Sequence, residues 1–537
     1  MSSFASSPTT PDARRDKHAE GFYSLAALHP DRTAIVLPTG EETTYGDLGA
    51  RINRISHALR SLGLAAGDAV AAVVRNGAEY FELVLATSQV GMSLVPVNWH
   101  LAPREVVYII QDSGAKIVVA DAGIAHALTT LTAAGEILPP HRYVVDHESV
   151  PGEPDGWQPY SSLGEGQPST PPDHRTAGLM MGYTSGTTGR PKGVKRNVPP
   201  TEPEELVRAV FLPLLAGYGV TPGEGVHLVC SPLYHAAPGF YALAFLHAGH
   251  TLVCHDRFDA EATLRDVERY RVTSSHMVPT QLHRLLRLPE EVRRRHDLSS
   301  LRLLIHAGAP CPVHVKRQML DWLGPVVWEY LGSTEGQATV VGPDEWLARP
   351  GTLGRPRPGV TVRILDETGT EVPRGEAGTI YFGTEGRPPA FEYHNDPEKT
   401  AASRAGGLVT VGDMGYVDED GYLFLLDRRT DLIVCGGVNI YPAEIEQHLA
   451  AHPAVADVAV IGVPDPEWGR SVLAVVQLVP EAKPGEDLAE ELTAFCREGL
   501  ASFKCPRRFE FLSEFPRTES GKLQRRVLRD AYVKEAD

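Results

Sequence analysis

Cysteine is scarce in this chain, with six residues among 537, and no two of them form a Cys-x-x-Cys pair or stand at metal-ligand spacing from a histidine. Such a set favours buried thiols over disulfides or a zinc site. Long apolar runs are also missing, since none approaches the ~20 residues that span a bilayer. The first 22 residues are polar and lack the apolar stretch of a signal peptide. We therefore expect a cytoplasmic protein without a membrane span.

Positive charge is in short supply too, because 51 Lys and Arg residues face 68 Asp and Glu residues and leave a formal net charge of −17. This balance disfavours a general affinity for nucleic acid or anionic membrane. The composition is otherwise that of a globular enzyme, and the length is several times the ~150 residues of a typical domain. We expect one large multi-layer domain and a smaller one. The sequence leaves the oligomeric state open, with a homodimer among the alternatives.

Helix-like and strand-like stretches alternate near the start of the chain. Apolar residues at helical spacing predict helices over 44–64 and 79–92, and the run between them, 68–74, is typical of a buried strand. Strands alternating with helices indicate an α/β fold. The N-terminal domain of α/β layers is expected to cover residues 1–427.

The residue pattern changes twice further along the chain. From about residue 351, short Val-, Ile- and Thr-rich runs at 361–369, 378–383 and 421–429 are separated by Gly, Pro and Asp. They predict a β-rich subdomain over about 351–427. Residues 428–537 then have the size and pattern of a compact α+β domain.

A glycine-rich loop stands at residues 183–193, with the sequence YTSGTTGRPKG. Hydroxyl side chains and successive backbone N–H groups can form a concave anion site, glycine lets the backbone approach a ligand closely, and Lys192 adds a compact charge. The loop is not the common GxxxxGK[ST] phosphate loop, because Arg-Pro-Lys-Gly follows Gly189. Residues 177–182 before it are predicted to be a buried strand. A solvated loop is the alternative, but the pattern favours a polyphosphate site.

Further motifs follow this loop in order: SPLYHAAPG (231–239), HAGAP (306–310), YLGSTEG (330–336), GRP (354–356), VGD (411–413), DRRTDLIVCGGVNIYPAEIE (427–446), SFKCP (502–506) and PRTESGKLQRR (516–526). With this set the chain strongly resembles the superfamily of acyl- and aryl-CoA synthetases, peptide-synthetase adenylation domains and beetle luciferases, over nearly its whole length. The resemblance implies a ligase that uses ATP, Mg²⁺ and coenzyme A. A carboxylate attacks the α-phosphate of ATP to give an acyl-adenylate and pyrophosphate, and a thiol then captures the acyl group.

The resemblance also assigns roles to nucleotide-binding residues. The loop would hold the β- and γ-phosphates and then pyrophosphate, through Thr184, Ser185, Gly186, Thr187, Thr188, Gly189 and Lys192. Residues of two later motifs would bind the rest of ATP and AMP: Gly308, Ala309, Pro310, Tyr330, Leu331, Gly332, Ser333 and Thr334. Asp413 would accept hydrogen bonds from the ribose hydroxyls, with Arg428 helping. Glu335, with Thr184, would hold Mg²⁺, which takes few protein ligands and keeps waters.

Other residues take catalytic and conformational roles by the same resemblance. Lys522 would bridge the carboxylate and the α-phosphate during adenylation, and His235 would be the gate of the acyl pocket. Gly436 and Gly437 would admit the pantetheine of CoA. The small C-terminal domain would be mobile, swinging about a hinge at Thr430 between the two steps. Without the resemblance, Lys522 reads as a surface lysine and His235 as a satisfied core histidine.

The acyl group is expected among apolar, aromatic or small residues, namely Tyr234, His235, Ala236, Ala237, Phe240, His306, Ala307, Gly308 and Gly332. Apolar walls favour an apolar guest, at about 25 cal/mol per Å² buried. Small side chains leave volume, so the sequence predicts a bulky acid, whether fatty, polycyclic or aryl.

Departures from the family pattern keep alternatives open. Many relatives carry an aromatic residue at the position of Leu331, Asp or Lys at that of Thr430, and Lys at that of Val434. An enzyme that captures a preformed acyl-adenylate would not need to bind ATP as tightly. Amino-acid adenylation is a second alternative, for which Asp259 in Phe-Asp-Ala could bind the ammonium, although Asp at a helix start is an ordinary N-cap. Two further alternative functions are a luciferase-like oxygenase and a nucleotide-binding scaffold without catalysis.

Overall fold

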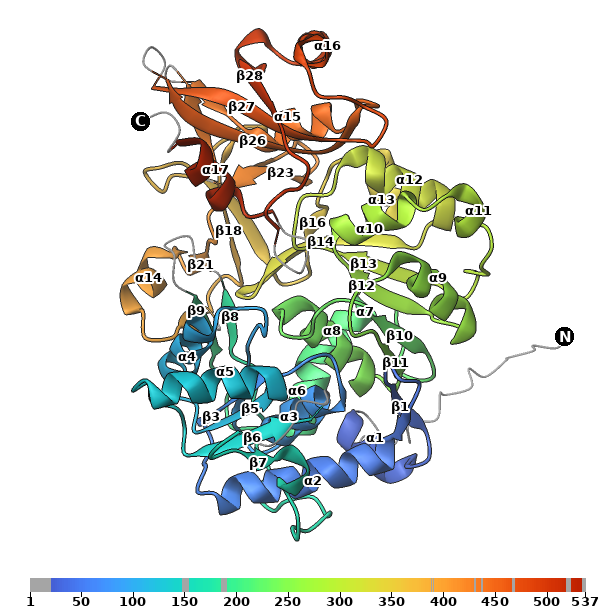
Figure 1. The fold of residues 1–537 in the computed structure, drawn as a ribbon, viewed down its shortest axis with the longest axis vertical. Coiled ribbons are helices and arrows are strands. Elements are labelled where there is room, and N and C mark those ends of the chain that lie inside the picture. The colour runs from blue at the N-terminus through green and yellow to red at the C-terminus, as the bar shows by residue number, and fades with distance from the viewer. Residues whose placement is uncertain are drawn as a thin grey trace, which may run out of the picture.

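The computed structural model describes residues 21–146, 154–184, 191–387, 389, 391–428, 431–435, 438–465, 469–517 and 523–533. Its ribbon shows a large N-terminal body and a smaller unit of C-terminal elements, at the top of Figure 1. The expected α/β architecture, with a large domain followed by a small one, is confirmed. Each of the six cysteines lies in the described ranges and is a free thiol. Among the described helices, none combines the length and the apolar character that a membrane crossing requires.

The largest sheet formed by the described residues has nine strands, in the order β16-β15-β14-β13-β12-β10-β11-β1-β2. The strands from β1 to β14 along this order run parallel, and β2, β15 and β16 pair antiparallel with their neighbours. Their bounds are β1 Thr33–Val36, β2 Glu42–Thr44, β10 Val226–Val229, β11 Thr251–Cys254, β12 Ser274–Met277, β13 Leu303–His306, β14 Val327–Ser333, β15 Gly336–Val341 and β16 Arg355–Pro356.

Both faces of this sheet are covered. Successive side chains of a strand point to opposite faces, so Leu303 and Ile305 of β13 join one hydrophobic core and Leu304 joins another. Helix α8 (Ala236–His247) packs in the first core. The second core lies under α9 (Ala260–Arg269), α10 (Pro279–Leu286), α12 (Val313–Leu323) and α13 (Pro343–Ala348).

A second sheet, in the order β4-β3-β5-β6-β7, is entirely parallel. Every residue of β3 (Ala69–Val73) and β5 (Ile117–Asp121) is buried, which explains their continuous apolar runs because helices cover both faces. The remaining strands and the helices of this layer are β4 Ser93–Pro96, β6 His141–Val145, β7 Gln158–Pro159, α1 Phe22–Leu28, α2 Tyr45–Ser61, α3 Ala78–Ser88, α4 Pro103–Asp112, α5 Ala122–Ala133 and η1 Tyr160–Ser162. The two helices and the strand predicted between residues 44 and 92 are therefore confirmed.

The two ends of the glycine-rich loop belong to a small antiparallel sheet, β19-β9-β8, formed by β8 (Gly182–Thr184), β9 (Lys192–Arg196) and β19 (Phe391–Tyr393). The strand predicted over residues 177–182 is wrong in extent, because β8 begins only at Gly182. Residues 177–181 bond instead to separate segments, Gly178 N to Ser88 O and Met181 N to Leu94 O. The chain then continues through α6 (Pro203–Leu206), a π-helical turn η2 (Val207–Phe211) and α7 (Leu212–Ala216).

The region predicted to be β-rich, about residues 351–427, forms a sheet in the order β20-β21-β18-β22-β23, with β17 paired to β18. The three predicted strands are present as β17, β18 and β23. The bounds are β17 Thr361–Leu365, β18 Gly378–Gly383, α14 Pro397–Ala402, β20 Arg404–Ala405, β21 Leu408–Val409, β22 Asp413–Val417 and β23 Leu423–Arg428.

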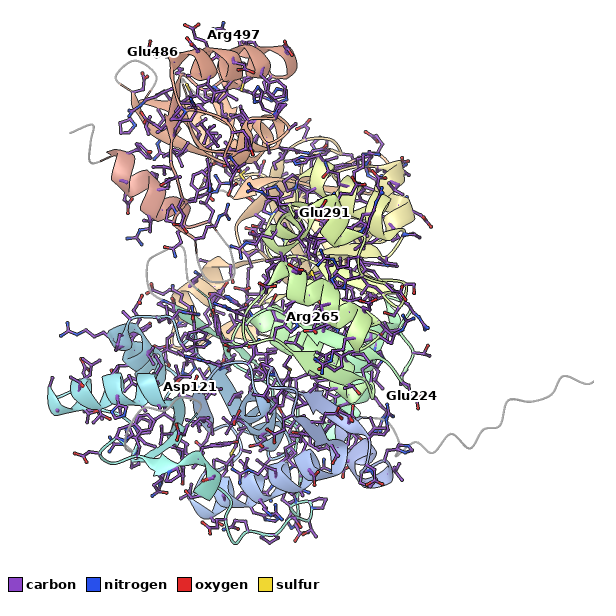
Figure 2. The ribbon with its side chains drawn as sticks, turned by 45° about the vertical axis from the view of Figure 1, so that its right-hand side comes forward. Asp121, Glu224, Arg265, Glu291, Glu486 and Arg497 are labelled. Atoms are coloured by element: carbon purple, nitrogen blue, oxygen red, sulfur yellow. The ribbon has the colours of Figure 1, made fainter. Side chains whose placement is uncertain are left out.

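The C-terminal elements have hydrophobic cores of their own, on the two faces of the sheet β26-β27-β28. Helix α16 (Glu486–Gly499) begins with acidic residues and has Arg497 in its last turn, which complements the helix dipole; Figure 2 labels Glu486 and Arg497 at its two ends. The other elements are β24 Ile433–Cys435, β25 Val438–Ile440, α15 Pro442–Leu449, β26 Val455–Asp465, β27 Gly469–Leu478, η3 Ser502–Lys504, β28 Arg508–Phe511 and α17 Arg525–Val533.

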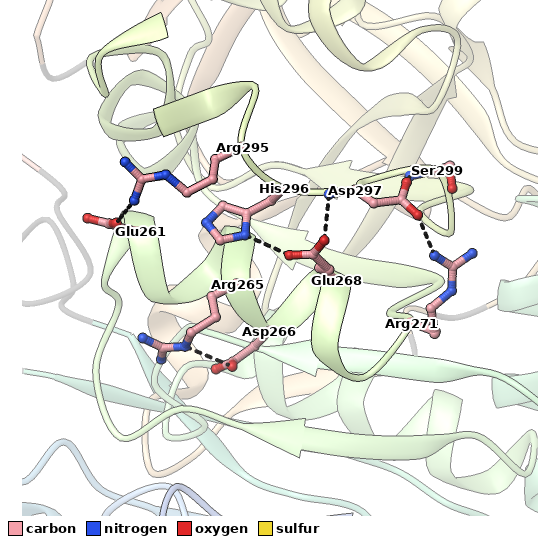
Figure 3. A network of polar contacts seen from close by, with 9 residues as sticks. All are labelled: Glu261, Arg265, Asp266, Glu268, Arg271, Arg295, His296, Asp297 and Ser299. Carbon is pink, nitrogen blue, oxygen red and sulfur yellow. Dashed lines mark hydrogen bonds and ion pairs between the residues drawn. The ribbon is translucent and has the colours of Figure 1, made fainter. Parts of the chain in front are cut away.

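A network of polar contacts ties α9 to the segment that follows α11 (Glu290–Arg293) and leads into β13 (Figure 3). His296 Nδ1 lies 2.9 Å from Glu268 Oε2, and Arg271 donates to Asp297 at 2.7 Å. Arg271 has a left-handed backbone, with φ 52°. These contacts anchor the entry to β13, whose far end carries His306 and the HAGAP motif.

Candidate active site

The two ends of the glycine-rich loop lie side by side. In the pair β8–β9, Thr184 stands opposite Lys192. A Cβ on Gly193 would lie only 3.0 Å from the ring of Tyr183, so glycine permits this close packing. The loop residues Ser185, Gly186, Thr187, Thr188 and Gly189 lie outside the described residues. The hairpin nevertheless brings the hydroxyl residue and the lysine predicted at its two ends to the same level.

A tight turn between β14 and β15 carries Thr334 and Glu335, with Ser333 opposite Gly336 in the ladder. Arg196, at the end of β9, donates from Nη2 to the backbone oxygen of Thr334 at 2.7 Å. Burial lowers the pKa of the Arg196 guanidinium, and the neighbouring Glu335 opposes that shift. The turn is thus held against the strand that leaves the glycine-rich loop.

The start of α8 reaches the same place. A Cβ on Gly182 would lie 3.1 Å from Cγ2 of Thr334 and 3.6 Å from Cβ of Ala236, so three motifs distant in sequence meet at the beginning of β8. His235 is the N-cap residue of α8, and its ring centroid lies 4.6 Å from that of Tyr234. The structure therefore places the predicted gate beside the predicted phosphate site.

Glu335 is buried, and its Oε1 accepts a hydrogen bond of 2.7 Å from the hydroxyl of Tyr393. Burial, followed by the Glu335 charge, raises the pKa of Tyr393 far above its usual range, so the phenol stays a donor. Within the described ranges no group of three or more His, Cys, Asp or Glu residues could hold a metal ion. Mg²⁺ needs no such group, because it is commonly held by one or two carboxylates together with phosphates and water. A single well-held carboxylate beside the predicted phosphate site fits that requirement.

Tyr330 and Leu331 lie on opposite faces of β14. Tyr330 belongs to the main core, where its hydroxyl lies 3.1 Å from His276 Nε2 and its ring centroid 5.5 Å from that of Tyr241 on α8. Leu331 packs instead beside Phe382 and its neighbours. The alternation of a strand requires this separation, so Tyr330 faces α8 and Leu331 faces the β-rich sheet.

The predicted acyl residues on α8 and β13 are close to this core. Ala307 belongs to it, and Phe240 packs against it with its ring centroid 4.8 Å from that of Phe211. Gly308 has a φ of +87°, a left-handed conformation that favours glycine, and it turns the chain after β13. Ala309 and Pro310 follow this turn, and Ala237 lies in the first turn of α8. A Cβ on Gly332 would lie 2.9 Å from the Tyr330 ring, so that strand position also requires glycine.

The predicted ribose pair is brought together by strand register. Asp413 begins β22 and stands directly opposite Arg428, the last residue of β23. The predicted hinge Thr430 and the predicted CoA-loop residues Gly436 and Gly437 lie outside the described residues.

Lys522 also lies outside the described residues, but the two ends of its loop are described. Arg517 and Leu523 form an isolated antiparallel bridge, and Arg517 makes an ion pair with Asp457 on β26. The described residues on either side of Lys522 are thus attached to each other and to the C-terminal sheet.

Several site residues were missed by sequence reasoning, and they come from one stretch, FEYHNDPEKT (391–400). Tyr393, Asp396 and Lys399 lie next to Glu335 and Lys192. A signal existed, because Asp-Pro at 396–397 is a strong helix start, and Asp396 does cap α14 by accepting from Lys399 N. Nothing local to that stretch indicates that it pairs with β9.

The chain matches a known protein family. A family described as "AMP-binding enzyme" matches residues 22–387, and its "AMP-binding enzyme C-terminal domain" matches residues 444–522. The chain is 35% identical to the fatty acid–[acyl-carrier-protein] ligase ScoC of Streptomyces coeruleorubidus, over 95% of each chain. It is 36% identical to a feruloyl-CoA synthase of an Amycolatopsis species, over 94% of this chain and 97% of the relative. Among solved structures, ATP-bound MatB from Rhodopseudomonas palustris superposes with a TM-score of 0.81 at 31% identity, covering 96% of this chain and 99% of that one.

Proposed function

Because the chain belongs to the AMP-binding enzyme family and is an ATP-dependent, AMP-forming acid–thiol ligase, we propose that it joins a bulky apolar carboxylic acid to coenzyme A through an acyl-adenylate. The acid is fatty, polycyclic or aryl. The relatives named above act on acids of this kind, according to their names.

One observation carries the proposal: the convergence of Gly182, Thr334 and Ala236. Gly182 opens the strand before the phosphate loop, Thr334 belongs to the turn that holds Glu335, and Ala236 begins the helix after the gate histidine. A carboxylate lying beside the start of α8 would therefore meet the α-phosphate of a nucleotide whose terminal phosphates lie at the loop. Holding two reactants in this way accelerates a reaction by making it effectively intramolecular.

The proposed reaction has two steps, as the family resemblance implies. A carboxylate oxygen attacks the α-phosphorus, the bond to the β-phosphate breaks, and pyrophosphate leaves with the displaced electron pair. In the second step the thiol sulfur attacks the acyl carbonyl, the bond from carbonyl carbon to phosphate oxygen breaks, AMP leaves and the thiol proton is lost. Lys522 would stabilise the charge that develops in the first step, and Arg196 and Tyr393 hold Thr334 and Glu335 in position. Bound Mg²⁺ would supply further charge neutralisation on the phosphates.

The residues near α8 support the proposal of a bulky apolar acid. Tyr234 and Ala307 are buried, Ala236 and Ala237 form the first turn of α8, and Phe240 packs on the main core. None of them carries a fixed charge. Burial of apolar area at about 25 cal/mol per Å² would then favour a large acid over acetate.

Amino-acid activation is not supported by the site. Asp259, the one acidic candidate for an ammonium ligand in the Phe-Asp-Ala stretch, accepts a hydrogen bond of 2.7 Å from Ala262 N and is the N-cap of α9. Its carboxylate therefore serves the helix start, as the sequence predicted.

The test combines two assays on a panel of acids: ATP–pyrophosphate exchange, and thioester formation followed by mass spectrometry. We expect exchange with bulky apolar acids and thioester with CoA. Holo-acyl-carrier protein supplied in place of CoA tests the other thiol acceptor, which the name of one relative suggests. Thioester from a supplied acyl-adenylate without any exchange would instead assign the chain to the second half-reaction, and best turnover with acetate or an amino acid would refute the proposed substrate class.

A further inference from the structure

The segment after β19 runs beside the phosphate-loop hairpin. β19 pairs antiparallel with β9, with Tyr393 opposite Val194, and the next residue, His394, donates its N–H to Gly193 O at 2.8 Å. The chain then turns at Asn395, which has a left-handed φ of 55°. The amide of Asn395 donates to Asp112 O, at the end of α4, at 3.0 Å. The turn is thus held from both sides and delivers Asp396 to the start of β9.

Asp396 uses its two carboxylate oxygens for different purposes. Oδ1 accepts the backbone N–H of Lys399 at 2.9 Å and caps α14. Oδ2 forms an ion pair with Nζ of Lys192, the lysine of the glycine-rich loop. Both side chains are largely buried, with 17% of Lys192 and 28% of Asp396 exposed. The carboxylate is therefore held by the helix start, while a lysine side chain has four rotatable bonds through which its ammonium group can turn toward another anion.

A second ammonium lies in the same cluster. Nζ of Lys399 lies 5.0 Å from the centroid of the Tyr393 ring, whose hydroxyl is bonded to Glu335. Lys399 is half-buried, and among the residues that the structure describes its side chain has no hydrogen-bond or ion-pair partner. Burial and the charge of Lys192 lower the pKa of Lys399, while Glu335 and Asp396 oppose that shift. Of these two neighbouring ammonium groups, that of Lys192 is paired with Asp396 and that of Lys399 has no carboxylate of the described residues bonded to it, because Glu335 accepts from Tyr393.

We propose that Lys399 is a second phosphate-binding lysine, which together with Lys192 holds the terminal phosphates of ATP and then pyrophosphate. Asp396 is the carboxylate that neutralises Lys192 when no phosphate is bound. A polyphosphate brings more negative charge than one carboxylate and can engage both ammonium groups. This inference rests on the proposed function and adds to it a residue from outside the glycine-rich loop.

The inference separates ligands by their phosphates. AMP has no β- or γ-phosphate, so Lys399 should matter for ATP and pyrophosphate and not for AMP. We expect Lys399→Gln, which keeps most of the side-chain length and removes the charge, to weaken the binding of pyrophosphate and Mg·ATP about tenfold, the usual worth of a charged hydrogen bond. Binding of AMP should change less than twofold. Lys399→Arg should retain pyrophosphate binding.

Asp396→Asn tests the other half of the cluster. The asparagine amide oxygen can still cap α14, but it no longer neutralises Lys192. We expect pyrophosphate to bind severalfold more tightly to this variant. Lys483→Gln, which removes an exposed lysine of the C-terminal unit, is the matched control for the loss of one positive charge.

Binding is measured by calorimetric titration of the full chain with pyrophosphate, Mg·ATP and AMP, after thermal unfolding has shown that each variant is folded. Equal weakening of AMP and pyrophosphate in Lys399→Gln, or no weakening of either, would overturn the role of Lys399. Weaker pyrophosphate binding in Asp396→Asn would overturn the role of Asp396. A wild-type chain that catalyses exchange while Lys399→Gln binds pyrophosphate normally contradicts this inference alone, whereas a wild-type chain without exchange contradicts the proposed adenylation.

Discussion

The hydroxyl of Tyr393 on β19 donates a hydrogen bond of 2.7 Å to Oε1 of Glu335, in the turn after β14, although the two residues are 58 positions apart in the chain. The bond joins the strand that borders the β8–β9 hairpin to the turn that carries the predicted metal ligand. It holds the carboxylate in one orientation before any ligand binds. Such preorganisation saves reorganisation at the moment of reaction.

Tyr393→Phe should therefore weaken the binding of Mg²⁺ without changing the fold. We expect adenylate formation to slow about tenfold, the worth of one hydrogen bond to a charged group, and more Mg²⁺ to be needed for half-maximal exchange. Thioester formation from supplied acyl-adenylate should be unchanged. Tyr416→Phe, a tyrosine on β22 whose ring stacks on Phe424, is the control. An unchanged Mg²⁺ requirement would show that the bond is only structural.

Lys522→Ala should remove adenylation selectively. Loss of a donor to transition-state charge costs on the order of 10²–10³ in rate, and the lysine is expected to contact the reacting groups only in the first step. Exchange and single-turnover thioester formation from supplied adenylate, measured on one preparation, separate the steps. Equal losses in both would show that the role is misassigned.

Lys316→Met should destabilise the large domain strongly. Lys316 on α12 is fully buried, and its Nζ lies 2.7 Å from Oε2 of buried Glu329 on β14. Removing one partner leaves an uncompensated buried charge, which costs about 3–5 kcal/mol. The double variant Lys316→Met with Glu329→Leu removes both charges and should recover most of the stability. Urea unfolding gives the free energy of unfolding of both variants. A double variant that is less stable than the single one would contradict this reasoning.

Stability should fall as the solution is acidified from pH 6.5. Burial lowers the pKa of His250 to about 4 and that of His276 to about 3. Between those values and pH 6.5 the unfolded chain binds protons that the folded chain does not, so the free energy of unfolding decreases as pH falls, by about 1.4 kcal/mol per pH unit for each histidine. His250→Gln should remove one such contribution and flatten the dependence between about pH 6 and pH 4 in urea unfolding. An unchanged slope would contradict the assignment.

Much of the fold could be predicted because local patterns carry it. The helical spacing after Thr44, the apolar run of β3 and the Asp259 cap each produced the element expected, since capping and burial act within a few residues. The strand expected over 177–182 was wrong for a related reason: an apolar stretch shows that residues are buried, but not whether their backbone bonds belong to one ladder or to Ser88 and Leu94 separately.

The sequence by itself determined the chemistry of this protein, because the ordered motifs from the glycine-rich loop to the TESGK stretch identify an adenylate-forming ligase, and the comparisons confirm that family. Only the tertiary structure decided which other residues surround the predicted phosphate site. Asp396 contacts Lys192 across 204 positions, because β19 pairs with β9 in a register that carries the following turn to the loop lysine. Strand register depends on the packing of whole sheets rather than on local spacing. The alternation of β14 is local, but only the packing of the sheets decided that Tyr330 enters the core under α8 and that Leu331 faces the β-rich sheet.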